Sequence, residues 1–158
     1  MPTAIRSDKI FLSSEKKTEE LAGKFLKKLK PGNIVFLYGE IGVGKTTFIR
    51  YLINGYQKEN KVELTEVTSP TFNLVNEYDV VSFIIQHYDL YRIINSEEIK
   101  NIGVLEDYEE LVTLIEWPEK IKKKVNNKID LFFEYGEDMD KRFLSIKGLD
   151  YKKLNAIR

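Results

Sequence analysis

The chain has 158 residues and balances 25 lysines and arginines against 25 aspartates and glutamates. A chain of this length forms about one domain, and its neutrality argues against a bulk nucleic-acid binder, which normally carries a basic excess. It has no cysteine, which excludes disulfides, thiolate zinc sites and a cysteine nucleophile. No signal peptide is visible, and the longest apolar stretch, 80–85, is too short to span a bilayer. We therefore expect a single cytoplasmic domain, residues 1–158, with no membrane partner.

The first half of the chain predicts an edge strand, a helix and then a strand–loop–helix unit. The first helix is capped by Ser13 or Ser14, carries apolar residues on one face and ends at the Pro-Gly pair 31–32. Gly55 is expected to close the helix after the loop. The strands predicted here are 10–12, 34–38 and 62–67.

The second half predicts two hairpins separated by short helices. The alternating segments 72–78 and 82–88 form the first hairpin, with Asp79 near its turn. Ser96 caps one short helix, and Pro118 suits the first turn of another. The remaining predicted elements are a short helix at 105–110, a buried strand at 111–115, a C-terminal hairpin of 129–135 and 143–146, and a loose tail at 148–158.

The segment between the strand 34–38 and the next helix is a complete phosphate-binding loop. It reads Gly39-Glu40-Ile41-Gly42-Val43-Gly44-Lys45-Thr46 and continues into the helix with Thr47. The glycines allow the backbone to curl and direct N–H groups at a phosphate, and the helix N-terminus adds positive potential. Lys45 supplies a full charge for the terminal phosphates, and the Thr46 hydroxyl is a Mg²⁺ ligand. A glycine-rich turn that merely caps a helix would explain neither Lys45 nor Thr46.

Two carboxylates that follow apolar strands could complete a nucleotide site. Asp89 follows the run 83–85, and Glu116 follows 111–115. Because ligands meet the carboxyl ends of strands in doubly wound folds, Asp89 could hold Mg²⁺ opposite Thr46, and Glu116 could orient or deprotonate a water. The structural alternatives are a turn cap for Asp89 and a solvated loop residue for Glu116.

Three nearby features are weaker signals. His87, the only histidine, faces the same side of its strand as Asp89, but a lone histidine is more often an ordinary sheet residue. Trp117, the only tryptophan, is either a packing residue or a contact near the nucleotide. The segment Ser69-Pro70-Thr71 lies where P-loop proteins place a switch that senses the terminal phosphate, yet it is also an ordinary turn.

Four segments, in their order and spacing, resemble the bacterial TsaE family, also called YjeE. They are 39–47, Ser69-Pro70-Thr71-Phe72, His87-Tyr88-Asp89-Leu90-Tyr91-Arg92 and Glu116-Trp117-Pro118-Glu119. The resemblance extends over residues 10–147. The family is a P-loop ATPase that works with TsaB and TsaD to make threonylcarbamoyladenosine, the modified base next to the anticodon of tRNAs. The resemblance implies ATP hydrolysis that drives or resets that assembly, rather than the carbamoyl transfer itself.

The resemblance also implies roles for individual residues. Lys45 would hold the phosphates, Thr46 the Mg²⁺, and Asp89 would be the acidic metal partner. Glu116 would be the hydrolytic carboxylate and lie near the metal. The other implied nucleotide-binding residues are 39–44, Thr47, Thr71 in the switch region and Trp117.

The predicted fold is α/β, a P-loop NTPase-like three-layer fold with a mixed central sheet and a C-terminal β-hairpin. The implied ligands are ATP and Mg²⁺, with weak hydrolysis by the protein alone. The implied partners are TsaB and TsaD, and tRNA is contacted only indirectly through their complex.

Three other functional classes share the loop. Asn127-Lys128-Ile129-Asp130 formally matches the guanine-reading motif of GTPases, but it precedes a predicted strand instead of following one. A small-molecule kinase would normally need a lid of arginines, and the arginines of this chain are not clustered: Arg6, Arg50, Arg92, Arg142 and Arg158. A nucleotide-gated adaptor would share every binding residue and differ only in whether Glu116 supports turnover.

Overall fold

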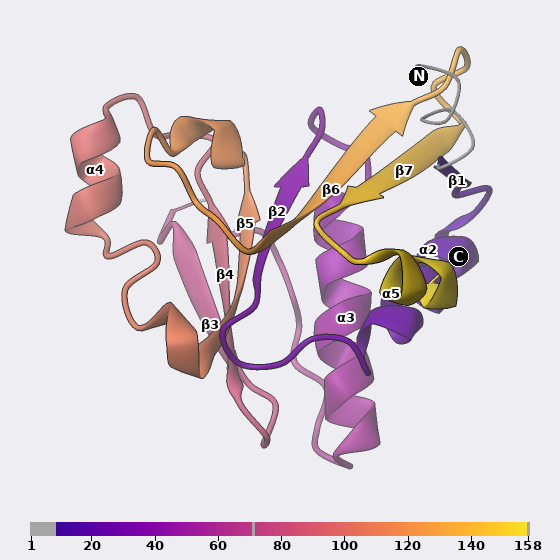
Figure 1. Ribbon diagram of the computed structural model, residues 1–158, viewed down its shortest axis with the longest axis horizontal. Coiled ribbons are helices and arrows are strands. Elements are labelled where there is room, and N and C mark those ends of the chain that lie inside the picture. Colours follow the sequence, from indigo (N-terminus) through magenta and orange to yellow (C-terminus); the bar gives the residue numbers. More distant parts are fainter. Residues whose placement is uncertain (1–8, 71, 158) are drawn as a thin grey trace.

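The computed structural model describes residues 9–70 and 72–157, so Thr71, a predicted nucleotide-binding residue, lies outside the described residues. Within these residues one seven-stranded sheet has the order β1-β7-β6-β2-β5-β4-β3 (Figure 1). Its strands are β1 (Ile10–Phe11), β2 (Ile34–Tyr38), β3 (Val75–Asp79), β4 (Ile84–Asp89), β5 (Leu111–Glu116), β6 (Lys128–Tyr135) and β7 (Arg142–Lys147). The central strands β6, β2, β5 and β4 are parallel, and β3 and β7 are antiparallel to their neighbours. The predicted mixed α/β class and the C-terminal hairpin are confirmed.

Helices cover the two faces of the sheet unequally. They are α2 (Glu15–Phe25), α3 (Lys45–Glu59), α4 (Ser96–Asn101) and α5 (Tyr151–Ile157). The helices α2, α3 and α5 lie together on one side, whereas α4 lies on the other (Figure 1). Alternation along β2 divides the core between the two faces: Val35 packs with Phe48 of α3, and Phe36 packs with Ile99 of α4. None of the described helices has both the length and the apolarity needed to cross a membrane.

The carboxyl ends of the central strands meet at one edge of the sheet. Leu37 of β2 pairs with Glu116 of β5, which in turn pairs with Asp89 of β4. The phosphate-binding loop leaves β2 at the same edge and enters α3 at Lys45. This register brings together three segments that are distant in the sequence.

The predicted strand at 62–67 is wrong, because this segment has no regular structure. Its backbone is bonded to side chains of α3 instead of to a strand. Thr65 N donates to Gln57 Oε1 at 3.1 Å, and Asn54 Nδ2 donates to Thr65 O at 3.0 Å. The following strand is also shorter than predicted: β3 begins at Val75, because Leu74 closes a turn with its N–H bonded to Pro70 O.

Helix ends differ from the predictions in ways that depend on tertiary contacts. Ser14 is the N-cap of α2, and Asn95, not Ser96, caps α4. Gly55 does not close α3; it allows close packing of α2, since an added Cβ would lie 3.0 Å from Leu26 Cδ1. The predicted helices at 105–110 and after Pro118 are only single 3₁₀ turns, η1 (Tyr108–Glu110) and η2 (Pro118–Lys120).

The predicted loose tail at 148–158 is wrong, because most of this segment forms the helix α5. Asp150 begins the helix by accepting a bond from Lys153 N at 2.8 Å through its side chain. Ile157 is fully buried in the core shared with α2 and α3. The last described turn of the chain therefore belongs to the folded domain.

Candidate functional site

A pocket of about 270 Å³ lies at the carboxyl edge of the sheet, where β2, β5 and β4 end. It contains most of the residues that the sequence singled out. Its lining consists of Ile41, Gly42, Gly44, Lys45, Thr46, Thr47, Ser69, Asp89, Tyr91, Glu116 and Trp117.

The loop has the backbone that the glycines were expected to allow. Gly39, Gly42 and Gly44 all have positive φ, at 143°, 80° and 116°. A Cβ at Gly39 would lie 2.7 Å from Phe133 O and 2.8 Å from Val43 Cγ1, so no side chain fits there. Gly44 is the N-cap of α3 and uses no side chain to cap it. The first turn of α3 therefore presents uncapped N–H groups to the pocket, as an anion site requires.

The side chain of Lys45 is buried inside the phosphate-binding loop. It is 4% exposed, its ammonium donates to Gly39 O, and Nζ lies 4.1 Å from the centroid of the Trp117 ring. Burial lowers the pKa of the Lys45 ammonium, and the nearby carboxylates of Glu116 and Asp89 partly oppose that shift. An anion in the pocket would restore favourable partners for this charge.

Thr46 and Glu116 are in direct contact across the pocket. Thr46 Oγ1 lies 3.1 Å from Glu116 Oε1 and 3.2 Å from Oε2. Since a carboxylate only accepts, the hydroxyl donates its proton to Glu116 and keeps its lone pairs for a cation. Glu116 is 3% exposed, so it is not the solvated loop residue that the sequence left as an alternative.

His87 completes this cluster, which the sequence did not predict. Its Nε2 lies 2.6 Å from Glu116 Oε2, and the imidazole is fully buried. The signal was available in principle: His87 faces the same side as Asp89, and β4 pairs with β5. The pairing itself could not be derived from one sequence.

Asp89 connects the pocket to the segment before β3. Its Oδ2 accepts a bond from the Ser69 hydroxyl, and its Oδ1 accepts one from Tyr91 N at 3.0 Å. Asp89 therefore caps a turn, as the structural alternative predicted, and its role as a metal partner stays a prediction. Ser69 lines the pocket, as expected of a switch segment.

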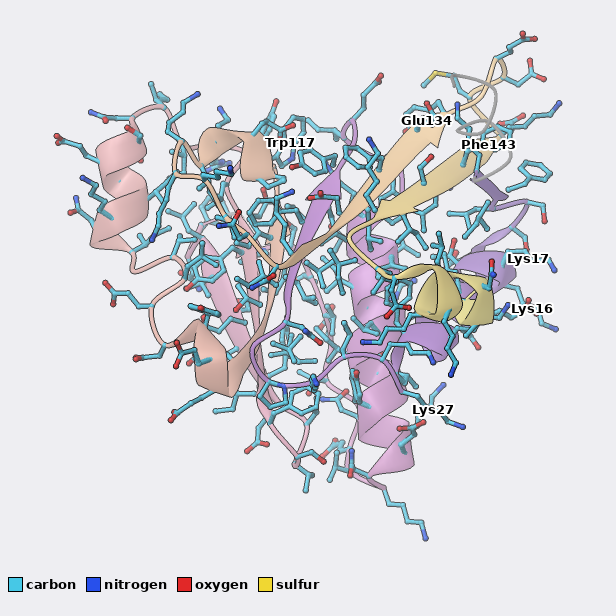
Figure 2. The ribbon with its side chains drawn as sticks, in the orientation of Figure 1. Lys16, Lys17, Lys27, Trp117, Glu134 and Phe143 are labelled. Atoms are coloured by element: carbon cyan, nitrogen blue, oxygen red, sulfur yellow. The ribbon has the colours of Figure 1, made fainter. Side chains whose placement is uncertain are left out.

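Trp117 lies at the end of β5, beside η2 (Figure 2). It adopts a left-handed backbone with φ of 59°. Its ring packs on that of Tyr91, with the centroids 4.9 Å apart. The two aromatic rings thus form a wall of the pocket opposite the loop.

The other predicted binding residues that the structure describes make no hydrogen bond within the Thr46–Glu116–His87 cluster, and only some of them line the pocket. Ile41 and Thr47 line the pocket, whereas Val43 is buried in the core and Glu40 is exposed. Val43 N bonds to Glu40 O at 3.2 Å, so this N–H serves the loop's own turn.

The rival motifs lie away from the pocket. Asp130 pairs with Phe36 on the face of the sheet away from α3 and is bonded to Lys128 at 2.6 Å, so it does not line the pocket. None of the described arginines lines the pocket. Arg50 is paired with Glu15 at 2.6 Å, and Arg92 lies over the Phe72 ring. Both the GTPase and the kinase readings lose their structural basis.

The donor set fits a magnesium ion only when a phosphate shares it. No group of three or more histidine, aspartate or glutamate side chains in the described part of the chain could hold a metal alone. Thr46, Glu116 and Asp89 supply oxygen atoms, which Mg²⁺ prefers, but it is usually held by one or two carboxylates together with phosphate oxygens.

Comparison with known proteins gives a consistent result. A family model described as "Threonylcarbamoyl adenosine biosynthesis protein TsaE" matches residues 12–143. The tRNA threonylcarbamoyladenosine biosynthesis protein TsaE of Rickettsia typhi is 42% identical over 143 residues, which are 86% of this chain and 92% of that protein. The TsaE protein of Rickettsia bellii is 47% identical over 111 residues, covering 70% and 74% of the two chains.

A solved structure shares the fold. The crystal structure of YdiB from Bacillus subtilis superposes with a TM-score of 0.71 at 21% sequence identity, covering 94% of this chain and 89% of that one. At this identity the likeness concerns the fold alone. The family match and the identities to its curated members establish the assignment: this chain belongs to the TsaE family of tRNA threonylcarbamoyladenosine biosynthesis proteins.

Proposed function

We propose that the chain is a Mg²⁺-dependent P-loop ATPase, weak on its own, that acts in the cytoplasm with TsaB and TsaD in the threonylcarbamoyladenosine modification of tRNA. Contact with tRNA is indirect, through that complex. The observation that carries the ATPase proposal is the contact of Thr46 with Glu116 beside the buried Lys45, inside a glycine loop whose first glycine, Gly39, has no room for a side chain. The partners follow from membership of the family.

The charges of the pocket support a requirement for magnesium. One lysine faces two carboxylates, Glu116 and Asp89, so the charged side chains of the pocket do not neutralise a triphosphate, and its binding should be tighter with a cation. A divalent cation, if bound, would supply the missing positive charge. Thr46 would hold it through the hydroxyl lone pairs, with Glu116 and Asp89 bound directly or through waters.

The residues of the chain divide the work of hydrolysis. Lys45 leaves Gly39 O and binds the terminal phosphates, where it stabilises the charge that develops on the transferred group. Glu116 orients a water for attack on the terminal phosphorus, the bond to the ADP oxygen breaks, and a proton passes to the carboxylate or to the phosphate. The rings of Tyr91 and Trp117 limit the access of other water.

One observation favours a nucleotide-gated adaptor as the second candidate. Glu116 already accepts bonds from Thr46 and His87, so it can serve the metal without acting as a base. In that case nucleotide binding alone would control docking to the partners.

The test is hydrolysis of ATP and of GTP by the protein alone and with TsaB and TsaD added. Slow ATP turnover that both proteins together raise supports the proposal. Tight ATP binding with no phosphate release under any condition supports the adaptor. Equal or faster turnover of GTP would contradict the nucleotide that we propose.

A further inference from the structure

We propose that His87 is a positioning residue that fixes the Glu116 carboxylate so that Oε1, rather than Oε2, faces the metal and the attacking water. This inference rests on the proposed ATPase function and adds a residue to its machinery. It starts from the shortest contact of the cluster, 2.6 Å between His87 Nε2 and Glu116 Oε2.

Only one direction of hydrogen bonding is possible between His87 and an ionised Glu116. An ionised carboxylate can only accept, so Nε2 must carry the proton and donate it. The other ring nitrogen, Nδ1, is buried and has no hydrogen-bond partner among the described residues. Glu116 is thus the hydrogen-bond partner that fixes the orientation of the imidazole ring, and the ring in turn fixes the orientation of the Glu116 carboxylate.

The two oxygens of the Glu116 carboxylate differ in their hydrogen bonds. Oε2 accepts from His87 and lies 3.2 Å from Thr46 Oγ1, while Oε1 has only Thr46, at 3.1 Å. Because the Thr46 hydroxyl has a single proton, it serves one oxygen at a time. Oε1 therefore keeps more free acceptor capacity than Oε2.

His87 lies where the sheet can hold it rigidly, so it can fix the orientation of the Glu116 carboxylate. It is fully buried on β4, directly paired with Leu114 of β5, beneath the end of the strand that carries Glu116. A group locked in the sheet is a rigid support, and residues that orient a metal-side ligand affect affinity or activity about 10- to 100-fold.

The substitutions that test this differ only in the donor. His87→Gln places an amide N–H as many bonds from Cβ as Nε2 is, so it can replace the bond. His87→Leu fills similar space without a donor. Leu114→Val is the matched control, since it disturbs packing at the paired position on the same face and makes no recorded bond to Glu116.

Two measurements separate positioning from simple structural support. The first is the affinity for a non-hydrolysable ATP analogue, with and without Mg²⁺, followed by fluorescence of the single tryptophan, Trp117, in the pocket wall. The second is kcat and KM for ATP, each with a thermal melt of the same sample.

For His87→Leu we expect the Mg²⁺ concentration for half-maximal effect to rise, and kcat to fall, about tenfold or more, with affinity in EDTA unchanged. His87→Gln should return both to within about threefold of the wild type, and Leu114→Val should lower only the melting temperature. The proposal is overturned if His87→Leu matches the wild type, if glutamine fails to rescue, or if affinity falls equally with and without Mg²⁺. A wild-type protein that binds analogue with Mg²⁺ but hydrolyses nothing contradicts the ATPase proposal instead, and the affinity measurement still decides the role of His87.

Discussion

Two buried charged clusters lie at nearly the same level of the sheet but on opposite faces. Glu116 pairs with Leu37 and faces α3, while Asp130 pairs with the preceding residue, Phe36, and faces away from α3. Glu116 meets Thr46 in a pocket. Asp130 meets Lys128. Burial first, and then the Asp130 charge, raise the pKa of Tyr38 to about 12.

The contrast shows which buried charges are available for chemistry. The phosphate-binding loop curls over the α3 face, so only carboxylates on that face reach it. The Lys128–Asp130 ion pair lies outside the pocket lining, and Asp130 Oδ1 has no hydrogen-bond partner among the described residues. Alternation along a strand, rather than the residue type, therefore separates a functional cluster from a structural one.

Loss of the charge in the pocket should have the largest effect. Lys45→Ala should weaken ATP binding about 100-fold or more and abolish turnover, because a charge-assisted contact to phosphate of about 3 kcal/mol is removed. Titration calorimetry measures the affinity. Lys58→Ala, in the last turn of the same helix, is the control, and an affinity within threefold of the wild type for Lys45→Ala would contradict the assignment.

Removal of the carboxylate should separate binding from turnover. Glu116→Ala should slow single-turnover hydrolysis about 10²–10⁴-fold, the usual contribution of a general base, while ATP affinity in EDTA stays within a few-fold. It should also lower the free energy of unfolding by about 1–3 kcal/mol, because His87 Nε2 loses its buried partner. Turnover at the normal rate would show that Glu116 serves only the metal or the fold.

The second cluster should affect stability alone. Lys128→Met keeps a side chain of similar length but removes the ammonium, which lies over the Phe36 ring and pairs with the Asp130 carboxylate. We expect the free energy of unfolding to fall by about 1–2 kcal/mol in urea titration, with no change in affinity for ATP or GTP. A selective change in GTP affinity would revive the guanine-reading interpretation of this segment.

Local chemistry made the site largely predictable. The loop, Asp89 and Glu116 follow from residue types next to apolar strands, because loop and strand ends must share one edge of a parallel sheet. The contact of His87 with Glu116 could not be predicted, since it depends on the pairing of β4 with β5, and pairing is not encoded in the spacing of either strand alone.

The misplaced elements have the same origin. The segment 62–67 has strand-like residues, but side chains of α3 satisfy its backbone. Gly55 was expected to end the helix, but the helix continues through it, because its missing side chain leaves room for Leu26. The tail at 148–158 carries Ile157, whose burial required a surface built by α2 and α3. In each case a partner distant in the sequence decided the outcome.

The smallest expected effect is a rise in stability at alkaline pH from the pocket cluster, whereas Tyr38 of the second cluster, with its raised pKa, contributes in the opposite direction. Burial lowers the pKa of Lys45 below its ordinary value of 10.5. Between the two values the unfolded chain holds a proton that the folded chain has lost, so the contribution of Lys45 to the free energy of unfolding rises with pH. ATP affinity should fall over the same window, because the neutral amine no longer attracts phosphate. Measured as differences from Lys45→Met, which removes the group and cancels the titration of other residues, stability and affinity should move in opposite directions; parallel changes would mean that Lys45 does not bind the phosphates.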